Sequence, residues 1–276
     1  MLASVSAETI GLLVLAVVAG GLLTGFLAGL LGIGGGGIVA PVLYEVFGIL
    51  GIDPAVRMHM AVGTSLAVMV PTTLRSFAAH KQRGGVDMAA FRRLAPAVLV
   101  GVVLGAAIAS HAPGAVLKAV WVTFAIVMSI KLAFGRDDWR LGDDLPPNWL
   151  VEAFGMFVGA VSTLLSIGGG AFVTTMLTLY GRTIQRAVGT SAGIGTLIAV
   201  PGAIGLAWAG WGEHGLPPLS IGYVNLVAAA LMIPTSVYAA PYGARLAHGI
   251  SRRSLELAFA ALLSTVGLRF LVSLFW

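Results

Sequence analysis

The stretch from Leu30 to Gly36 reads LLGIGGG, and the stretch from Leu164 to Gly170 reads LLSIGGG. Both lie inside apolar runs, and each is followed by the same Ala-Val-Gly-Thr-Ser block, at residues 61–65 and 187–191. Three consecutive glycines are unfavourable in a helix, because each costs up to about 1 kcal/mol relative to alanine. The pattern therefore predicts two copies of one unit, each containing a helix that is broken at its glycine triplet.

The composition places this unit in a lipid bilayer. The chain is 58% hydrophobic and only 10% charged, whereas soluble domains carry about 25% charged residues. Runs such as Ile10–Leu31 and Leu94–Ser110 approach the roughly 20 residues that a helix needs to cross the hydrocarbon core. We expect an all-α polytopic membrane protein, since the short alternating strands of a β-barrel are not apparent. The net charge of +5 comes from basic residues between apolar segments, so nucleic acid is not expected as a partner.

The apolar runs divide into ten segments, five in each copy. We expect a first repeat at residues 1–135, a cytoplasmic linker at 136–147 and a second repeat at 148–276. The connection at residues 84–87, which reads GGVD, roughly matches the connection at 222–225, which reads GYVN. This match supports the same division.

The distribution of Lys and Arg predicts the orientation of the segments. These residues crowd four connections, which the positive-inside rule assigns to the cytoplasm, while the connection at residues 210–219 has none. The sides alternate only if every segment crosses, which predicts ten crossings, inverted repeats and both termini outside. The second segment of each copy, at 36–51 and 169–181, is short, and whether it crosses fully or is re-entrant stays open.

The two glycine triplets are the first candidate binding residues. Backbone groups freed by a helix break need partners in the protein or in a wet cavity, because lipid offers none. The N–H groups of a restarting helix carry a partial positive charge that attracts anions. We therefore predict two opposed anion-binding turns near the bilayer midplane, with close packing as the alternative interpretation. The residues are Gly34, Gly35 and Gly36 in the first copy and Gly168, Gly169 and Gly170 in the second.

Hydroxyl groups provide the second set of candidates, since they can bind oxyanions without the cost of burying a charge. The alternative is that they bond only to carbonyls of their own or a neighbouring helix. The candidates in the two Gly-Thr-Ser blocks are Gly63, Thr64, Ser65, Gly189, Thr190 and Ser191. Thr174 and Thr175 are added on the second side only, and Arg57 and Arg75 are candidates for guiding an anion. Cysteine is absent and the five histidines have no metal-ligand spacing, so we expect no metal, cofactor or catalytic residue.

With these motifs the chain resembles the sulfite exporter TauE/SafE family of bacterial membrane transporters, also grouped as the 4-toluene sulfonate uptake permeases. The resemblance rests on the two glycine turns, the Gly-Thr-Ser blocks and the connection from His80 to Asp87, and it covers nearly the whole chain. It implies a secondary transporter for a small sulfur-containing anion, such as sulfite, sulfoacetate or another sulfonate, in the bacterial inner membrane. The site residues that it implies are the two glycine triplets and the two Gly-Thr-Ser blocks.

An inverted repeat with broken helices is typical of alternating access. Export is the favoured direction, because a negative interior drives an anion outward by about 2.3 kcal/mol per charge per 100 mV. An anion channel of the same architecture is the main alternative, and a membrane-embedded enzyme is a weaker one. The identity of the anion, coupling to protons or sodium, and assembly into a homo-oligomer stay open.

Overall fold

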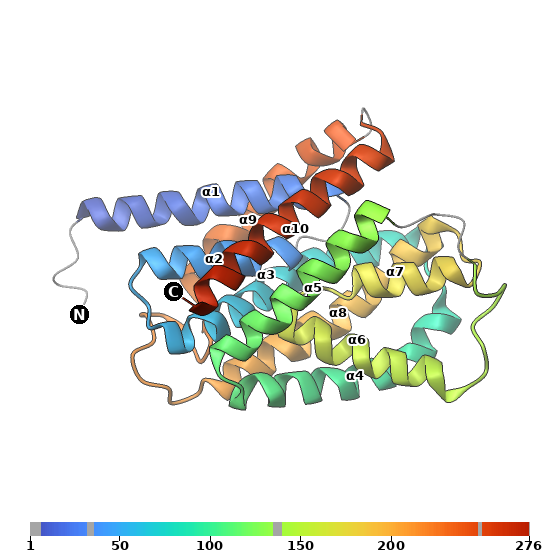
Figure 1. The fold of residues 1–276 in the computed structure, drawn as a ribbon, viewed down its shortest axis with the longest axis horizontal. Coiled ribbons are helices and arrows are strands. Elements are labelled where there is room, and N and C mark those ends of the chain that lie inside the picture. Colours follow the sequence, from blue (N-terminus) through green and yellow to red (C-terminus); the bar gives the residue numbers. More distant parts are fainter. Residues whose placement is uncertain (1–6, 32–35, 135–139, 248–249, 276) are drawn as a thin grey trace.

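The computed structural model describes residues 7–31, 36–134, 140–247 and 250–275, and these are almost entirely helical (Figure 1). The helices are α1 (Ala7–Leu31), α2 (Gly36–Ile49), α3 (Pro54–Gln82), α4 (Met88–His111), α5 (Gly114–Phe134), α6 (Trp149–Leu165), α7 (Gly170–Leu179), α8 (Ile184–Ala209), α9 (Leu226–Ala247) and α10 (Arg252–Phe275). Two short strands, β1 (Ser220–Ile221) and β2 (Val224–Asn225), pair antiparallel before α9. The predicted all-α polytopic class is confirmed.

The helices differ in their capacity to cross a bilayer. Within the described residues, α4, α5, α8, α9 and α10 are long and apolar enough to span the hydrocarbon core. By contrast, α2 has 14 residues and α7 has 10. At 1.5 Å per residue they are about 21 Å and about 15 Å long, against a core of about 30 Å. Neither of these two helices is long enough to cross by itself.

Helices α6 and α7 form a hairpin that enters the protein and returns to the same end. The carbonyl of Leu179, at the end of α7, accepts a hydrogen bond from the Leu141 amide in the linker before α6, at 2.9 Å. Arg182, just after α7, pairs with Asp144 of the same linker. The segment at 169–181 therefore ends near the start of α6, at the same end of the molecule. This agrees with the charge pattern, which puts the linker and the connection after α7 on the same side.

We call the end of the molecule that carries the linker the linker end, and the opposite end the far end. Helix α3 begins at the far end and finishes at the linker end, while α8 runs in the opposite direction. The two helices pack on each other, as do α5 and α10, and α1 packs on α9 as α6 packs on α4. All these pairs are retained when α1–α5 are exchanged with α6–α10, which agrees with an inverted repeat. The repeat boundaries at 135 and 148 remain a prediction.

The centre of the molecule is formed by α3 and α8. Every residue of α3 from Met58 to Leu66 is buried, so this part of the helix is enclosed on all faces. Helix α4, by contrast, leaves large apolar side chains such as Leu99, Val100 and Val103 exposed. This distribution fits a protein whose outer helices meet lipid and whose central helices can carry polar side chains.

Candidate functional site

The chain reverses between α6 and α7 through two residues with left-handed backbone. Ser166 has φ 49° and Gly169 has φ 66°, which a glycine adopts without strain and a serine does not. The Ser166 side chain is fully buried, and its hydroxyl donates to the Ser65 hydroxyl at 3.0 Å. The predicted helix break is therefore present in the second copy, and it is held by a hydrogen bond to α3 of the first.

Helix α7 restarts at Gly170 with a glycine, Gly169, at its N-cap position. Gly169 offers no side-chain acceptor to the first amides, and these amides have no acceptor within the helix. Gly168 and Gly195 let α8 approach the turn closely, because a Cβ on Gly195 would lie 2.9 Å from the Gly168 carbonyl oxygen. The amide end of α7 thus lies beside a space that residues of α7 and α8 both line.

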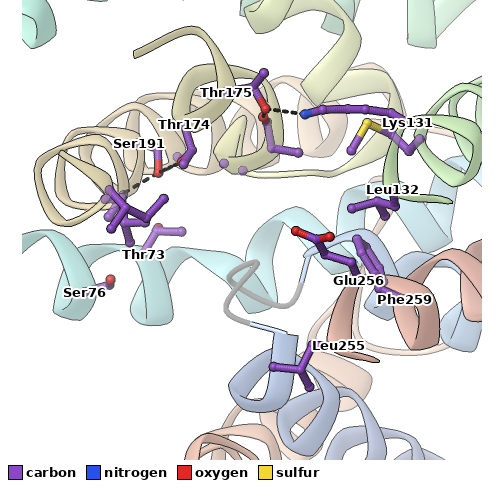
Figure 2. A pocket seen from close by; sticks show the side chains of 18 of the residues that line it. Thr73, Ser76, Lys131, Leu132, Thr174, Thr175, Ser191, Leu255, Glu256 and Phe259 are labelled. Carbon is purple, nitrogen blue, oxygen red and sulfur yellow. Dashed lines mark hydrogen bonds between the residues drawn. The ribbon is translucent and has the colours of Figure 1, made fainter. Parts of the chain in front are cut away.

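What lies there is a cavity of about 450 Å³. It is lined by the last part of α3, the last part of α5, the start of α7, the first half of α8 and the start of α10 (Figure 2). Of the predicted residues, the structure brings together Gly168, Gly170, Thr174, Thr175 and Ser191 in its wall. Among the described residues, the lining contains one basic side chain, Lys131, and one acidic side chain, Glu256.

The donors that face this cavity can be ranked by the hydrogen bonds they already make. Thr174 donates to Ser191 at 3.1 Å, Ser191 donates to the Val188 carbonyl, and Thr175 donates to the Ala171 carbonyl. A hydroxyl has one proton to donate, whereas an ammonium has three. Lys131 Nζ donates one of its protons to Thr175 (Figure 2). The strongest donors left for an anion are therefore the Lys131 ammonium and the first amides of α7.

The predicted threonines of the two Gly-Thr-Ser blocks lie elsewhere and make a reciprocal pair of contacts. Thr64 Oγ1 accepts a hydrogen bond from the Asn225 amide at 3.0 Å, and Thr190 Oγ1 accepts one from the Asp87 amide at 2.8 Å. Asp87 and Asn225 occupy matching places before α4 and α9, where each side chain caps its helix. Each threonine thus holds a connection of the opposite repeat.

The glycines of these blocks allow the same close approach. A Cβ on Gly63 would lie 2.6 Å from the Tyr223 carbonyl oxygen, and one on Gly189 would lie 2.0 Å from that of Gly85. Both separations are shorter than real Cβ contacts allow, so glycine is required at both positions. The structure gives Gly63, Thr64, Gly189 and Thr190 a packing role, and it places none of them in the cavity lining.

Two of the remaining candidates, Gly34 and Gly35, lie outside the described residues. Gly36 begins α2, and the others are not among the described residues that line the cavity. Gly169 packs behind the turn, where a Cβ would lie 2.9 Å from Ile198. Arg57 donates to the Ile52 carbonyl at the far end, and Arg75 is exposed on α3 and does not line the cavity. The predicted meeting of two opposed turns therefore stays a prediction.

A network of ion pairs lies at the linker end of the molecule, near the cavity. Arg182 Nε lies 2.7 Å from Asp87 Oδ2, and Arg182 Nη2 lies 2.6 Å from Asp144 Oδ1. Burial raises the pKa of the Asp87 carboxyl, but hydrogen bonds from the Ala90 amide and the Arg182 guanidinium outweigh it and lower the pKa overall. The same two carboxylates raise the pKa of Arg182. The network ties the first repeat, the linker and the α7–α8 connection together.

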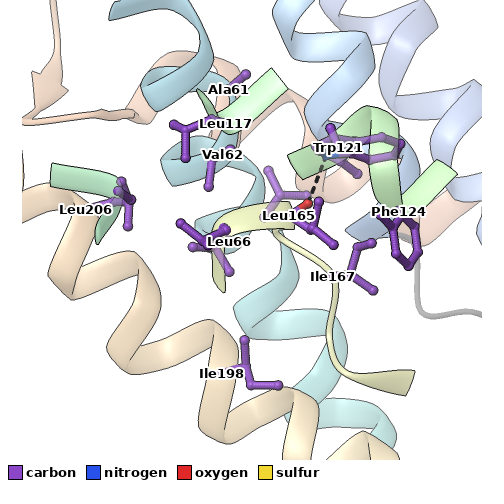
Figure 3. Close-up of a cluster of buried hydrophobic side chains, with 14 of the residues drawn as sticks. Ala61, Val62, Leu66, Leu117, Trp121, Phe124, Leu165, Ile167, Ile198 and Leu206 are labelled. Carbon is purple, nitrogen blue, oxygen red and sulfur yellow. Dashed lines mark hydrogen bonds between the residues drawn. The ribbon is translucent and has the colours of Figure 1, made fainter. Parts of the chain in front are cut away.

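The far end of the molecule is packed where the linker end is hollow. Trp121 of α5 is fully buried, its indole N–H donates to the Leu165 carbonyl at 3.2 Å, and Leu117 and Val62 are equally buried beside it (Figure 3). Trp121 also meets Phe270 of α10 edge to face, with ring centroids 5.7 Å apart. The carbonyl freed at the end of α6 thus has an internal partner, and apolar side chains fill the space beyond the turn.

Comparison with known proteins gives the family. The family model described as Sulfite exporter TauE/SafE matches residues 17–270, most of the chain. The chain belongs to the sulfite exporter TauE/SafE family. The resemblance seen in the sequence is confirmed.

Curated relatives of this TauE/SafE-family protein are named as transporters. A probable membrane transporter protein of Haemophilus influenzae is 30% identical over 249 residues, covering 90% of this chain and 94% of the relative. One of Methanocaldococcus jannaschii is 29% identical over 258 residues, covering 90% and 91%. No solved structure matches. Family and relatives together identify a multi-pass membrane transporter.

The two charged residues of the described cavity lining were not among the predicted site residues. The sequence marks Lys131 only as one of several basic residues near a segment end, and Glu256 only as an acidic residue close to an interface. Nothing in the local sequence separates them from other such residues. Their importance depends on the convergence of α5, α7 and α10, which is a property of the tertiary structure.

Proposed function

We propose that this protein is a secondary carrier of a small sulfur-containing anion in the bacterial inner membrane, and that it works by alternating access. The observation that carries the proposal is the cavity at the linker end, which is lined by Lys131 and by the amide end of α7. Thr174, Thr175 and Ser191 complete its wall, and each of these hydroxyls would have to leave its present acceptor to donate to an oxyanion. The sulfur-containing substrate class comes from the family and not from the geometry.

The charge distribution supports a cytoplasmic position for the linker end. The described basic residues near this end include Lys81, Arg83, Arg92, Arg93, Lys131, Arg140, Arg182, Arg186, Arg245 and Arg253, whereas those near the far end are Arg57, Lys118 and Arg269. Under the positive-inside rule the linker end faces the cytoplasm. The cavity then opens inward, the termini lie outside, and the structure corresponds to an inward-facing state. An anion leaving from this side would move down the membrane potential.

The packed far end favours a carrier over a channel. A channel needs a continuous path in its conducting state, whereas a carrier closes one side while the other is open. Here Trp121, Phe270 and Leu117 are buried beyond the turn. In our proposal these residues separate when one bundle of helices rotates against the other, and the cavity at the linker end then closes.

Binding to the purified protein tests the substrate class. We would titrate sulfite, sulfoacetate, taurine, thiosulfate and sulfate, with acetate and malonate as carboxylate controls. We expect at least one sulfur oxyanion to bind more tightly than the carboxylates. Equal binding of the carboxylates would remove the substrate class, and a failure of all these anions to bind would remove the anion carrier itself. In proteoliposomes, saturable counterflow of labelled substrate is expected of a carrier, and its absence with unsaturable flux would indicate a channel.

The orientation can be tested with single cysteines, because the chain has none of its own. Ser76→Cys places a thiol in the cavity lining, and Val62→Cys places one in the fully buried core as a matched control. A membrane-impermeant maleimide should label Ser76→Cys in inside-out vesicles and leave it unlabelled in intact spheroplasts. Labelling from the periplasmic side alone would overturn the inward-facing assignment.

A further inference from the structure

The described lining of the cavity carries one charged side chain of each sign. Lys131 reaches it from α5 and Glu256 from α10, and Figure 2 shows the carboxylate of Glu256 directed into the space that Lys131 also faces. Among the described lining residues, these are the two ionised side chains. Any anion that approaches Lys131 and the start of α7 therefore also meets the field of a carboxylate.

A second basic residue, Arg253, lies close to Glu256. Arg253, one turn before Glu256 on α10, has Nη1 3.6 Å from Glu256 Oε2 but is half exposed and lies outside the lining. Its guanidinium donates to the carbonyls of Leu132 and Ala133 at the end of α5. Arg253 thus holds α10 against α5 and sets where Glu256 lies, while Lys131 remains the cation inside the cavity.

We propose that Lys131 and Glu256 set the charge class of the substrate, so that the cavity selects singly charged sulfonates over doubly charged ones. This inference rests on the proposed anion carrier. One ammonium and the partial charge of the α7 amides can balance a single negative charge. A second negative charge on the ligand would find no further cation among the described lining residues and would be repelled by Glu256.

The alternative role for the pair is structural, with Lys131 and Glu256 serving only to hold α5, α7 and α10 together. A structural role predicts that either substitution weakens binding of every ligand alike, through loss of packing. A charge-selecting role predicts that the two substitutions act differently on ligands of different charge. Selectivity between two ligands, rather than affinity for one, therefore separates the two roles.

The experiment uses methanesulfonate, with one negative charge, and methanedisulfonate, with two, because the charge of neither depends on pH near neutrality. Binding of both would be measured by calorimetry with the purified full-length protein at pH 7 and fixed ionic strength. The variants are Lys131→Gln and Glu256→Gln. Lys81→Gln is the matched control, since it removes one exposed positive charge near the same end of the molecule, outside the cavity lining.

We expect the wild type and the Lys81→Gln control to prefer methanesulfonate. Glu256→Gln should shift the ratio of affinities toward methanedisulfonate by about tenfold, because it removes one repelling charge. Lys131→Gln should weaken methanesulfonate by about tenfold, since it removes a charge-assisted hydrogen bond, and methanedisulfonate by more, since a doubly charged ligand is attracted more strongly by the ammonium.

Two results would overturn the inference. One is an unchanged affinity ratio in Glu256→Gln while both ligands still bind; the other is Lys131→Gln binding methanesulfonate as well as the control does. Both would leave the anion carrier standing. If neither ligand binds the wild type although sulfite or thiosulfate does, the charge selection for sulfonates is equally wrong. If no sulfur oxyanion binds at all, the proposed function fails first.

Discussion

Replacing Thr190 by valine separates a packing role from a binding role at the Gly-Thr-Ser motif. The Thr190 hydroxyl accepts a hydrogen bond from the Asp87 amide at 2.8 Å and donates to the Arg186 carbonyl at 2.7 Å. Valine keeps the shape but offers no oxygen. The Arg186 carbonyl still has its helix partner, whereas the Asp87 amide loses its acceptor where the α3–α4 connection packs against α8.

The expected cost follows from the burial of this contact. Thr190 is fully buried, and a buried donor left without an acceptor costs about 1–3 kcal/mol. We therefore expect Thr190→Val to lower the free energy of unfolding by about 2 kcal/mol. Affinity for the anion should change little, since Thr190 does not line the cavity.

The measurement is chemical or thermal unfolding in detergent micelles, followed by a binding titration of the folded variant. Thr123→Val is the matched control, because that hydroxyl is exposed on α5 and bonds only to the Ala119 carbonyl of its own helix. We expect the control to unfold like the wild type. The reasoning is refuted if Thr190→Val unfolds like Thr123→Val, or if it keeps full stability and loses anion binding.

Three further outcomes follow from the same geometry. Gly169→Ala should destabilise the protein more than Gly212→Ala in thermal melts. Both residues have positive φ, which costs about 1–2 kcal/mol for alanine, but of the two only Gly169 would bring its new Cβ against a neighbour, Ile198, at 2.9 Å. Equal losses of stability would contradict this. Because the pKa of Asp87 is lowered on folding, its stabilisation is present above about pH 4 and is lost as pH falls through the folded value. Melts from pH 7 to pH 3 should therefore show the wild type and Asp87→Asn converging at the acid end, and a constant gap would refute the assignment. Arg269→Ala should leave the melting temperature unchanged within error, since its pair with Glu45 is largely exposed; a clear drop would mean that this pair closes the far end.

The sequence was sufficient for the features that depend on local composition. Hydropathy located the ten helices, and the glycine triplet located the break after α6, because lipid tolerates a broken helix only where the protein covers it. The short length of the second segment in each copy was also visible in the sequence. The return of α7 to the linker end was not, because it depends on contacts such as that between Leu141 and Leu179, which are distant in sequence.

The site was less accessible from the sequence, for a physical reason. Repetition of the Gly-Thr-Ser block indicated Thr64 and Thr190 as site residues. A motif can be repeated for any reason that applies to both copies, however, and here the reason is the close contact between the repeats. The cavity lies at the linker end, whereas the residue that matches Lys131 in the second copy, Arg269, lies near the far end and pairs with Glu45. Lys131 and Glu256 become neighbours only after α5, α7 and α10 converge.

The exchanged hydrogen bonds at Thr64 and Thr190 also bear on how such a chain could arise. A backbone amide in each of the connections before α4 and α9 donates to a threonine oxygen from the other set of five helices. Either set alone would therefore leave that amide without its hydrogen-bond acceptor. A half-length ancestor packed in this way would have required a second copy of itself inserted in the opposite direction. Fusion of two such genes would then have fixed one orientation for each half and freed them to diverge, with a charged aspartate kept on one side and a neutral asparagine on the other.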